Sequence, residues 1–479
     1  MKVFGRWAAA GGQRAADWAW QVCGLGLLLA LAALPMAVTA GEHPDPDSGL
    51  PEPSRVIQAG PEDYREAVAR LQPGDWLQLA PGEYPRPLSL RRLQGTAEAP
   101  IVVSGPAEGD PAVLLGRPGA NTVSLLDSAH IVVRHLTLDG QRHPIAGVVA
   151  EAHGNYAHDI TLEHLRIRNY DRGQGNTGIT NRVPAWNWVI RHNDIRDVGT
   201  GLYLGQSDGD APFINGLIEH NHVARTRGYN MQIKHQNPRD TLPDMPVDPK
   251  ETVIRYNVFD KSEGGSSGGR ARPNLLLGHW PLEGPGSEDR YRVYGNLFYQ
   301  NPHERLFQGE GHVALYSNLF VNRHGDGLIL MPHNDVPKEV LILDNTVMAA
   351  GFGIRLDRPD GNYTQQVAGN AVFAAQPLRL PDGLASADDN HTESLERAGE
   401  YLVAPLAGLD ELDLYPRDGA LGRDEATQPA ASGLPDVSLD FNARERTTDR
   451  WGAYGTDQPF NPGRRAGVGP ALPDCAPCR

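Results

Sequence analysis

The sequence predicts an all-β fold, a single-stranded right-handed parallel β-helix in which the chain winds through successive stacked coils. A sequence motif of two short apolar runs recurs from residue 131 to residue 381, and seven copies carry an asparagine at the equivalent position of the motif. These asparagines are Asn193, Asn221, Asn257, Asn296, Asn318, Asn345 and Asn370. The steps between them are 28, 36, 39, 22, 27 and 25 residues, which is typical of coils that carry inserted loops.

The apolar runs are four to six residues long and alternate with polar residues, a pattern that indicates strands and not helices. The turns between them are too short to hold a helix, so parallel strands must pair coil on coil at about 4.8 Å. We expect each repeated asparagine to occupy a sharp corner with a left-handed backbone. We also expect the amides to bond to one another along the axis.

An apolar segment near the N-terminus predicts export. Residues 22–40 are apolar, follow the basic residues Lys2, Arg6 and Arg14, and end in the small-residue pattern Val38-Thr39-Ala40. This pattern is typical of a signal peptide at 1–40, and a retained N-terminal anchor is the alternative. We therefore expect a periplasmic or secreted protein with no membrane span after removal of the signal.

Composition then divides the rest of the chain. Residues 41–54 are rich in Pro, Asp and Gly and predict a disordered linker. Residues 55–384 are expected to form the β-helix. They begin with a short amphipathic capping helix whose apolar face is Tyr64, Val68 and Leu71, followed by a first strand at 76–80. Residues 385–479 predict an irregular C-terminal wrap and cap, with 437–455 as the closing segment.

Charge and cysteine usage narrow the classes of partner. The formal net charge of −15 argues against a nucleic-acid partner, and an anionic substrate would need a local basic patch. Cys475 and Cys478 are placed to form a small disulfide in an oxidising compartment. The chain has no Cys/His spacing typical of a metal site and no Gly-rich phosphate loop, so neither is predicted. We expect a monomer.

Alignment of the second strand of each coil predicts which side chains share a column. The inward column includes Leu306, and alternation sends the residue at each strand's end outward. This outer column is Glu151, Arg182, Gly205, Lys234, Gly278, Gly309, Met331 and Asp357. The column beside it contains His235, His279 and Glu310, with His333 one place further on. Lys234 would stand in an open slot between two glycines, although an exposed strand lysine is also a common way to keep a sheet edge soluble.

Three motifs resemble a known family. The run PGDWLQLAPGEY (73–84) followed by GTAEAPIVVSG (95–105) resembles the opening coils of the family-six polysaccharide lyases, which include the alginate lyases and chondroitinase B. FQGEGHVALYSNLF (307–320) is similar to a later coil of that family. SLDFNARERTTDRWGAYG (438–455) resembles the end cap of many exported β-helix proteins.

This resemblance implies β-elimination in an acidic, uronate-containing polysaccharide. NMQIKHQ (230–236) falls where these lyases carry the lysine that removes a proton, so Lys234 is the candidate base. His279 or His235 would be the acid, and Glu310 would orient His279. The remaining candidate substrate contacts are Arg182, Arg270, Arg272, Tyr203, Gln232, Trp280 and His333. The arginines suit a carboxylate, and the insertion 262–273 would carry two of them over the groove.

The chain also departs from that family. Gly278 stands where the family has an arginine before its histidine, and 225–234 lacks the acidic residues that bind calcium. Calcium-assisted elimination therefore does not carry over, and no cofactor is predicted, although Ca²⁺ held by loop oxygens stays open. Three alternatives stay open: Arg270 or Arg272 substitutes from the inserted loop, the chemistry differs, or no catalytic activity remains.

Two other functions fit the same scaffold. One is a glycoside hydrolase, for which Asp335 and Asp357 are the nearest paired acids. The other is a non-catalytic polysaccharide-binding or envelope protein that uses outward Tyr203, Phe307 and Trp280 as sugar platforms. A catalytic protein should gather Lys234 and the histidines in one cleft, whereas a passive binder should show a flat aromatic strip.

Overall fold

The computed structural model describes residues 49–239, 242–423 and 433–463 of the chain. The predicted signal peptide, most of the predicted linker and both C-terminal cysteines lie outside these residues. One compact unit begins at Leu50 and contains all the helices and strands described below. In the described part of the chain, no helix combines the length and the apolar character that a membrane crossing requires.

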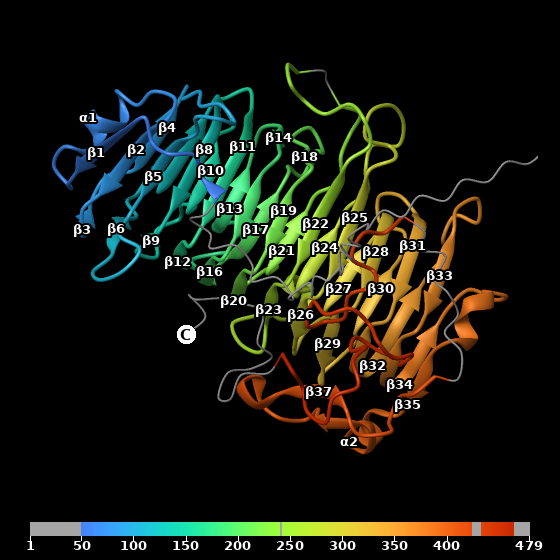
Figure 1. The fold of residues 1–479 in the computed structure, drawn as a ribbon. Helices are drawn as coiled ribbons and strands as arrows, with labels where there is room; N and C mark the ends of the chain where they lie inside the picture. Colours follow the sequence, from blue (N-terminus) through green and yellow to red (C-terminus); the bar gives the residue numbers. More distant parts are fainter. Residues whose placement is uncertain (1–48, 240–241, 424–432, 464–479) are drawn as a thin grey trace, which may run out of the picture. The chain divides into compact units, whose positions relative to one another are not determined.

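The chain forms the right-handed parallel β-helix that the repeat predicted, with three strand faces. Figure 1 shows the strands stacked in sequence order from blue to orange. Each coil contributes one strand to face A, one to face B and one to face C, and every pairing between coils is parallel. Side chains that point inward from the three faces form one continuous apolar core along the axis.

The strands of each face follow in chain order. Face A consists of β1 (Arg55–Ala59), β2 (Asp75–Leu79), β5 (Ile101–Ser104), β8 (Ser128–Arg134), β11 (Ala157–Glu163), β14 (Ala185–Trp186), β15 (Val189–Arg191), β18 (Phe213–Ile214), β19 (Leu217–Glu219), β22 (Glu251–Arg255), β25 (Arg290–Tyr294), β28 (Gly311–Tyr316), β31 (Pro337–Leu343) and β33 (Gln365–Ala368). Face B consists of β3 (Gly82–Tyr84), β6 (Ala112–Leu115), β9 (Leu136–Asp139), β12 (Arg166–Tyr170), β16 (Asp194–Val198), β20 (His222–Thr226), β23 (Val258–Asp260), β26 (Leu297–Tyr299), β29 (Leu319–Asn322), the first parts of β32 (Thr346–Leu356) and β34 (Ala371–Arg379), and β35 (His391–Glu393). Face C consists of β4 (Leu88–Arg91), β7 (Val123–Leu126), β10 (Val148–Ala150), β13 (Thr177–Asn181), β17 (Thr200–Leu204), β21 (Met231–Ile233), β24 (Leu275–Leu277), β27 (Phe307–Gly309), β30 (Leu328–Leu330) and the second parts of β32 and β34.

The N-terminal end differs from the prediction in one respect. The first strand is β1, which precedes the capping helix α1 (Tyr64–Val68) and pairs with β2 along its whole length. β1 was missed because most of its side chains are exposed, so it lacks the alternation that marks a half-buried strand. α1 buries Tyr64 and Val68 against the first coils, and the Tyr64 hydroxyl donates to the Arg86 carbonyl at 2.6 Å.

The repeated asparagines form a continuous ladder inside the helix. Each side-chain amide donates to the Oδ1 of the asparagine one coil further on at 2.8–3.0 Å, and that Oδ1 also accepts the backbone N–H of the first asparagine at 2.9–3.1 Å. The seven predicted members are fully buried, and Asn390 adds an eighth. The expectation of amides bonded along the axis is confirmed.

The left-handed backbone at this corner belongs to the residue before each asparagine. The prediction that the asparagine itself has the left-handed conformation was therefore wrong by one residue. These residues have φ between 51° and 72° and are His192, His220, Tyr256, Gly295, Ser317, Asp344 and Gly369. The asparagine must point inward to reach the next coil, so its predecessor makes the sharp turn and points outward. Outward rings at this corner stack on one another, with centroids 4.9 Å apart for His135 and His164 and 5.0 Å apart for His164 and His192.

A second apolar cluster covers the outer side of the later coils. Outward residues of β25, β26, β28 and β29 pack against residues from the C-terminal segment, including Leu414, Tyr415, Phe441 and Tyr454. That segment contains η3 (Ala385–Asp388), η4 (Leu395–Arg397), α2 (Ala398–Tyr401), η5 (Leu409–Glu411) and an antiparallel pair of β36 (Leu402–Ala404) with β37 (Asp413–Pro416). The Tyr316 hydroxyl donates to the Pro435 carbonyl at 3.0 Å.

The ladder makes a stability prediction. Asn257→Ala removes an amide that donates to the Ile218 carbonyl and to Asn296, and it leaves buried partners unsatisfied. We expect the free energy of unfolding to fall by about 3 kcal/mol, measured by chemical denaturation. The matched control is Asn362→Ala, an exposed asparagine whose amide bonds only to Asp360 in its own turn. Equal losses in the two variants would contradict a supporting role for the ladder.

Candidate functional site at the ends of the face C strands

The candidate residues gather where face C strands end and loops lead to face A. β21, β24, β27 and β30 lie side by side in consecutive coils (Figure 1), with Ile233 paired to Leu277, Leu277 to Gly309 and Gly309 to Leu330. Residues directly after these four strands therefore form one outward column. Its members are Lys234, Gly278, Glu310 and Met331.

The observed register corrects the predicted columns at one coil. Phe307, and not Leu306, pairs with Leu275 and Leu328, so Gly309 lies on the inward side and Glu310 takes its place in the Lys234 column. Both Leu306 and Phe307 are fully buried, so their hydrophobicity alone did not distinguish the strand residue from the corner residue. The one-residue shift reverses which side chains face outward.

Lys234 occupies the predicted slot between two glycines. A side-chain carbon at Gly205 would lie 3.0 Å from the Lys234 Cβ, and one at Gly278 would lie 2.3 Å from the His235 backbone nitrogen. Neither position accommodates a larger residue without movement, so the glycines keep the space around the lysine open. Partial burial lowers the pKa of Lys234 below its usual value, although the negative charge of Glu310 opposes this effect.

Two histidines complete the centre of the cluster. The rings of His235 and His279 lie 5.4 Å apart between centroids and are tilted by 30°. Burial lowers the pKa of His235, and the neighbouring charges of Lys234 and His279 lower it further. His279 Nδ1 lies 2.5 Å from the Trp280 carbonyl oxygen, to which it donates, so Nε2 is the nitrogen left to exchange a proton.

Glu310 was predicted to orient His279, and the hydrogen bonds it makes in this structure go to backbone N–H groups of the site. Its carboxylate accepts the backbone N–H groups of His333 at 3.1 Å, Asn334 at 2.8 Å and Asp335 at 3.0 Å, and the His279 backbone N–H at 3.3 Å. Glu310 is buried, so these four donors replace its hydration. The carboxylate thereby ties the loop after β30 to the two preceding coils.

That loop brings in a residue that the sequence did not reveal. Asn334 Nδ2 lies 3.3 Å from His235 Nδ1, across 99 residues of sequence. No motif around Asn334 marks it, because its place depends on how Glu310 folds the loop. His333 is exposed beside it and is close enough for its charge to lower the pKa of His235.

Three further candidates lie on the same face. Arg182 directly follows β13, one coil before Gly205, and is half-buried. Tyr203 and Gln232 pair across β17 and β21 in the outward column of the strands themselves. The Tyr203 hydroxyl lies 2.8 Å from Ser207 Oγ, and Tyr203 stays partly exposed, whereas Gln232 is only 4 % exposed.

The insertion that carries Arg270 and Arg272 lies at the other end of the strands. Its Ser266 N–H donates to the Arg227 carbonyl, and the Arg272 guanidinium lies over the Tyr229 ring at 6.0 Å, before β21 begins. Arg272 also donates to the Ala271 carbonyl at 2.6 Å, and Arg270 is exposed. The structure therefore does not bring these two arginines next to Lys234.

The aromatic residues proposed as sugar platforms are largely internal. Trp280 is 2 % exposed and stacks on Tyr291 at 4.1 Å, and Phe307 is fully buried in the core. The expectation that both face outward was wrong. Trp280 turns inward because it begins the loop toward face A, and Phe307 is the inward residue of β27. Of the three, Tyr203 alone stays partly exposed, so they do not form a flat aromatic strip.

The two candidate hydrolase acids are both paired with cations. Asp335 lies 3.1 Å from Lys338 Nζ, and Asp357 is held by two donors of Arg355. The hydrogen bond from Arg355 lowers the pKa of Asp357, which favours the ionised carboxylate. A general acid must hold its proton near neutral pH, so this environment does not suit Asp357 for that role.

Comparison with known proteins finds only distant structural similarities. The sequence matches no protein-family model and no curated protein. An alginate lyase from Paenibacillus sp. str. FPU-7 is similar at 17 % identity over 59 % of this chain and 97 % of its own, with a TM-score of 0.36. The pectate lyase Pel9A shares 13 % identity over 86 % and 98 %, with a TM-score of 0.39. A GH136 lacto-N-biosidase from Eubacterium ramulus shares 14 % identity over 71 % and 68 %, with a TM-score of 0.42.

The hydrogen bonds between the Glu310 carboxylate and the backbone give the first prediction for this site. Glu310→Gln replaces one accepting oxygen by an NH₂ group that faces N–H donors, so the loop of 333–335 should loosen. We expect amide hydrogen exchange at residues 333–335 to accelerate at least about tenfold, measured by mass spectrometry. The control is Glu263→Gln, an exposed glutamate in the inserted loop. Unchanged protection at 333–335 would show that the carboxylate does not hold this loop.

The buried lysine Lys261 lets us predict how the stability of the folded chain depends on pH. Burial lowers the pKa of Lys261 to about 7, and its Nζ donates to the carbonyls of Gly228 at 2.7 Å and Arg272 at 2.8 Å. Between that pKa and the unfolded value of 10.5, the unfolded chain binds a proton that the folded chain does not, so this lysine makes stability rise with pH. We expect Lys261→Met to reduce the rise in Tm between pH 7 and pH 9, whereas Lys250→Met should retain it. Identical pH profiles for all three proteins would refute the assignment.

Proposed function

We propose that this protein is an exported polysaccharide lyase that cleaves an acidic, uronate-containing polymer by β-elimination. The observation that carries the proposal is the position of Lys234 in an open slot beside the His235–His279 pair. Partial burial in this slot lowers the pKa of Lys234. A lysine in this state is suited to remove a proton from carbon, because more of it is neutral near physiological pH. The resemblance to family-six lyases at 230–236 supports the same role.

The proposed reaction uses the neutral amine of Lys234 as the base. The amine takes the proton from the carbon beside the sugar carboxylate, and the electron pair left behind forms an enolate. Collapse of the enolate forms a carbon–carbon double bond and breaks the bond to the glycosidic oxygen. His279, through Nε2, gives that oxygen a proton, and His235 lies close enough to share this role.

Arg182 is the proposed partner of the substrate carboxylate. The guanidinium is fixed in charge and matches a carboxylate with two parallel hydrogen bonds. Arg182 and Lys234 lie in the same outward column with Gly205 between them, so a sugar ring spanning the glycine would meet both. Charge neutralisation at the carboxylate is what makes the neighbouring proton acidic enough to remove. This local positive charge also attracts an anionic polymer to a protein whose net charge is −15.

Two observations favour a lyase over the other functions considered. A passive binder was expected to present a flat aromatic strip, and Phe307 and Trp280 are in the core instead. A hydrolase needs a pair of carboxyl groups in different protonation states, and Asp335 and Asp357 are both ion-paired. The proposal includes a monomer that acts in the periplasm or outside the cell, on the strength of the apolar segment 22–40.

The proposal predicts unsaturated products from at least one uronate polymer. We expect ultraviolet absorbance to rise on alginate, chondroitin, pectate or a heparin-type substrate, because elimination creates a conjugated double bond. Lys234→Ala and His279→Ala should each lower kcat by about 10²–10⁴-fold. Lys250→Ala, a lysine outside the column, should retain activity. Silence on all four polymers, or equal activity of Lys234→Ala, would exclude the mechanism.

The pH profile separates the base from a merely positive group. Activity should rise with pH as Lys234 loses its proton, with a midpoint below the ordinary lysine value of about 10.4. Lys234→Arg keeps the positive charge but cannot give up its proton, so it should be as inactive as Lys234→Ala. Substantial activity in Lys234→Arg would show that residue 234 contributes charge and not base catalysis.

A further inference from the structure

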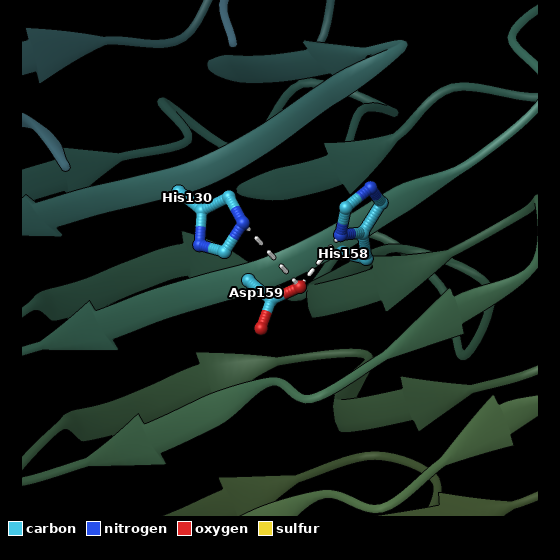
Figure 2. Close-up of side chains that lie close together, drawn as sticks. All are labelled: His130, His158 and Asp159. Atoms are coloured by element: carbon cyan, nitrogen blue, oxygen red, sulfur yellow. Dashed lines mark hydrogen bonds and ion pairs between the residues drawn. The ribbon is translucent and has the colours of Figure 1, made fainter. Parts of the chain in front are cut away.

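A second cluster of chemically active side chains lies on face A, several coils before Lys234. Figure 2 shows the Asp159 carboxylate between the imidazole rings of His130 and His158. Asp159 Oδ2 lies 2.6 Å from His158 Nδ1 and 4.0 Å from His130 Nε2. The three residues each offer one possible ligand atom within 4.8 Å of the other two. The proposed lyase function uses none of these residues.

The stacking of two coils creates this cluster. Ala129 pairs with His158 and Ile131 pairs with Ile160, so His130 on β8 lies opposite Asp159 on β11. Both His130 and Asp159 have φ of 52°, which interrupts the alternation of each strand at the same level. His130 and Asp159 therefore face outward together in the middle of face A, and their side chains are 27 % and 28 % exposed.

Neighbouring side chains fix the orientation of this cluster. Asn187 Nδ2 donates to Asp159 Oδ1 at 3.1 Å, which leaves Oδ2 directed at the histidines, and Asn215 in turn donates to Asn187 at 2.7 Å. The indole of Trp186 lies flat against the His158 ring, with centroids 4.5 Å apart and planes 6° apart. Residues that bind a metal ion are commonly oriented in this way by hydrogen bonds and packing from residues outside the ligand set.

We propose that His130, His158 and Asp159 bind one divalent transition-metal ion of the zinc type. The proposed ligand atoms are those that already face one another, His130 Nε2, His158 Nδ1 and Asp159 Oδ2. Two imidazole nitrogens with one carboxylate oxygen suit zinc and its neighbours, whereas calcium and magnesium prefer oxygen ligands alone. Three protein ligands leave a coordination position for water or for an external ligand.

The geometry requires only small movements. Bonds of about 2.0–2.2 Å to nitrogen and oxygen place tetrahedral ligands roughly 3.5 Å apart. The His130 ring must therefore approach Asp159 by about half an ångström, and His158 Nδ1 must move away from Asp159 Oδ2 by about 0.9 Å. His130 is partly exposed and free to turn by that amount. In His158, Nδ1 exchanges its hydrogen bond to Asp159 for the metal, and the neutral ring carries its proton on Nε2 instead.

The charge of the ligand set suits a divalent cation. An Asp carboxyl ionises at about pH 3.9, so it offers a charged oxygen at neutral pH, and neutral imidazoles each offer a nitrogen lone pair. A metal ion at this place would add to the bonds between two coils and would stabilise the folded chain by mass action.

Direct binding of Zn²⁺ to the full, untagged protein tests the proposal. We expect one Zn²⁺ per chain in competition with a chromophoric chelator, and a visible absorption spectrum of low-coordinate Co²⁺ in the same site. His130→Ala and Asp159→Asn should each weaken the affinity by more than about 100-fold, and Asn187→Ala by about tenfold. Added Zn²⁺ should raise the Tm of the wild-type protein but not of His130→Ala.

The control is His153→Ala, an exposed histidine in the loop before β11, which should bind Zn²⁺ as the wild type does. Far-ultraviolet circular dichroism checks that each variant keeps its strands, and the partly exposed His130 provides the safer variant if Asp159→Asn misfolds. The proposal fails if the wild type does not bind Zn²⁺, or if His130→Ala and Asp159→Asn bind it unchanged. Unchanged binding would mean that the three side chains form only a hydrogen-bonded and ionic cluster.

Discussion

The fixed register between successive coils is the constraint on which the rest of this structure depends. Parallel backbone hydrogen bonds set that register on three faces, and the buried asparagine ladder sets it a fourth time at the corner between faces A and B. An asparagine that slips by one residue would lose both of its bonds to the next coil. A slip would also turn the inward column of its strand outward, so the core and the ladder enforce the same alignment.

Both candidate sites follow from this register. Residues that are 29 and 44 apart in the chain become neighbours at about the strand spacing of 4.8 Å, as His130 and Asp159 do on face A and Lys234 and Gly278 do on face C. The strand end on face C opens a column to the solvent beside long loops. The left-handed residues within face A strands do the same within a sheet, where alternation alone would have turned either His158 or Asp159 inward.

The electrostatics of the face C site depend on which groups are buried and which find partners. Glu310 is buried but satisfied by four backbone donors, so it holds the loop of 333–335 without needing a cation. Lys234 lies next to two histidines and is half-buried, and its burial lowers its pKa. The same column therefore contains one carboxylate that has a structural role and one amine whose proton is weakly held.

The sequence by itself determined the parallel β-helix, because few other folds are compatible with a repeated asparagine and apolar runs of period two. It also located Lys234, His235 and His279 on one surface and found the glycine slot around the lysine. Only the tertiary structure decided the details within each coil: the left-handed residue before each asparagine, the inward turn of Trp280, the position of Glu310 in the lysine column, and the contact between Asn334 and His235. These details depend on loops and single-residue shifts, where adjacent apolar residues such as Leu306 and Phe307 are equally suited to the core. The pairing of coils, which no local pattern encodes, selects between them.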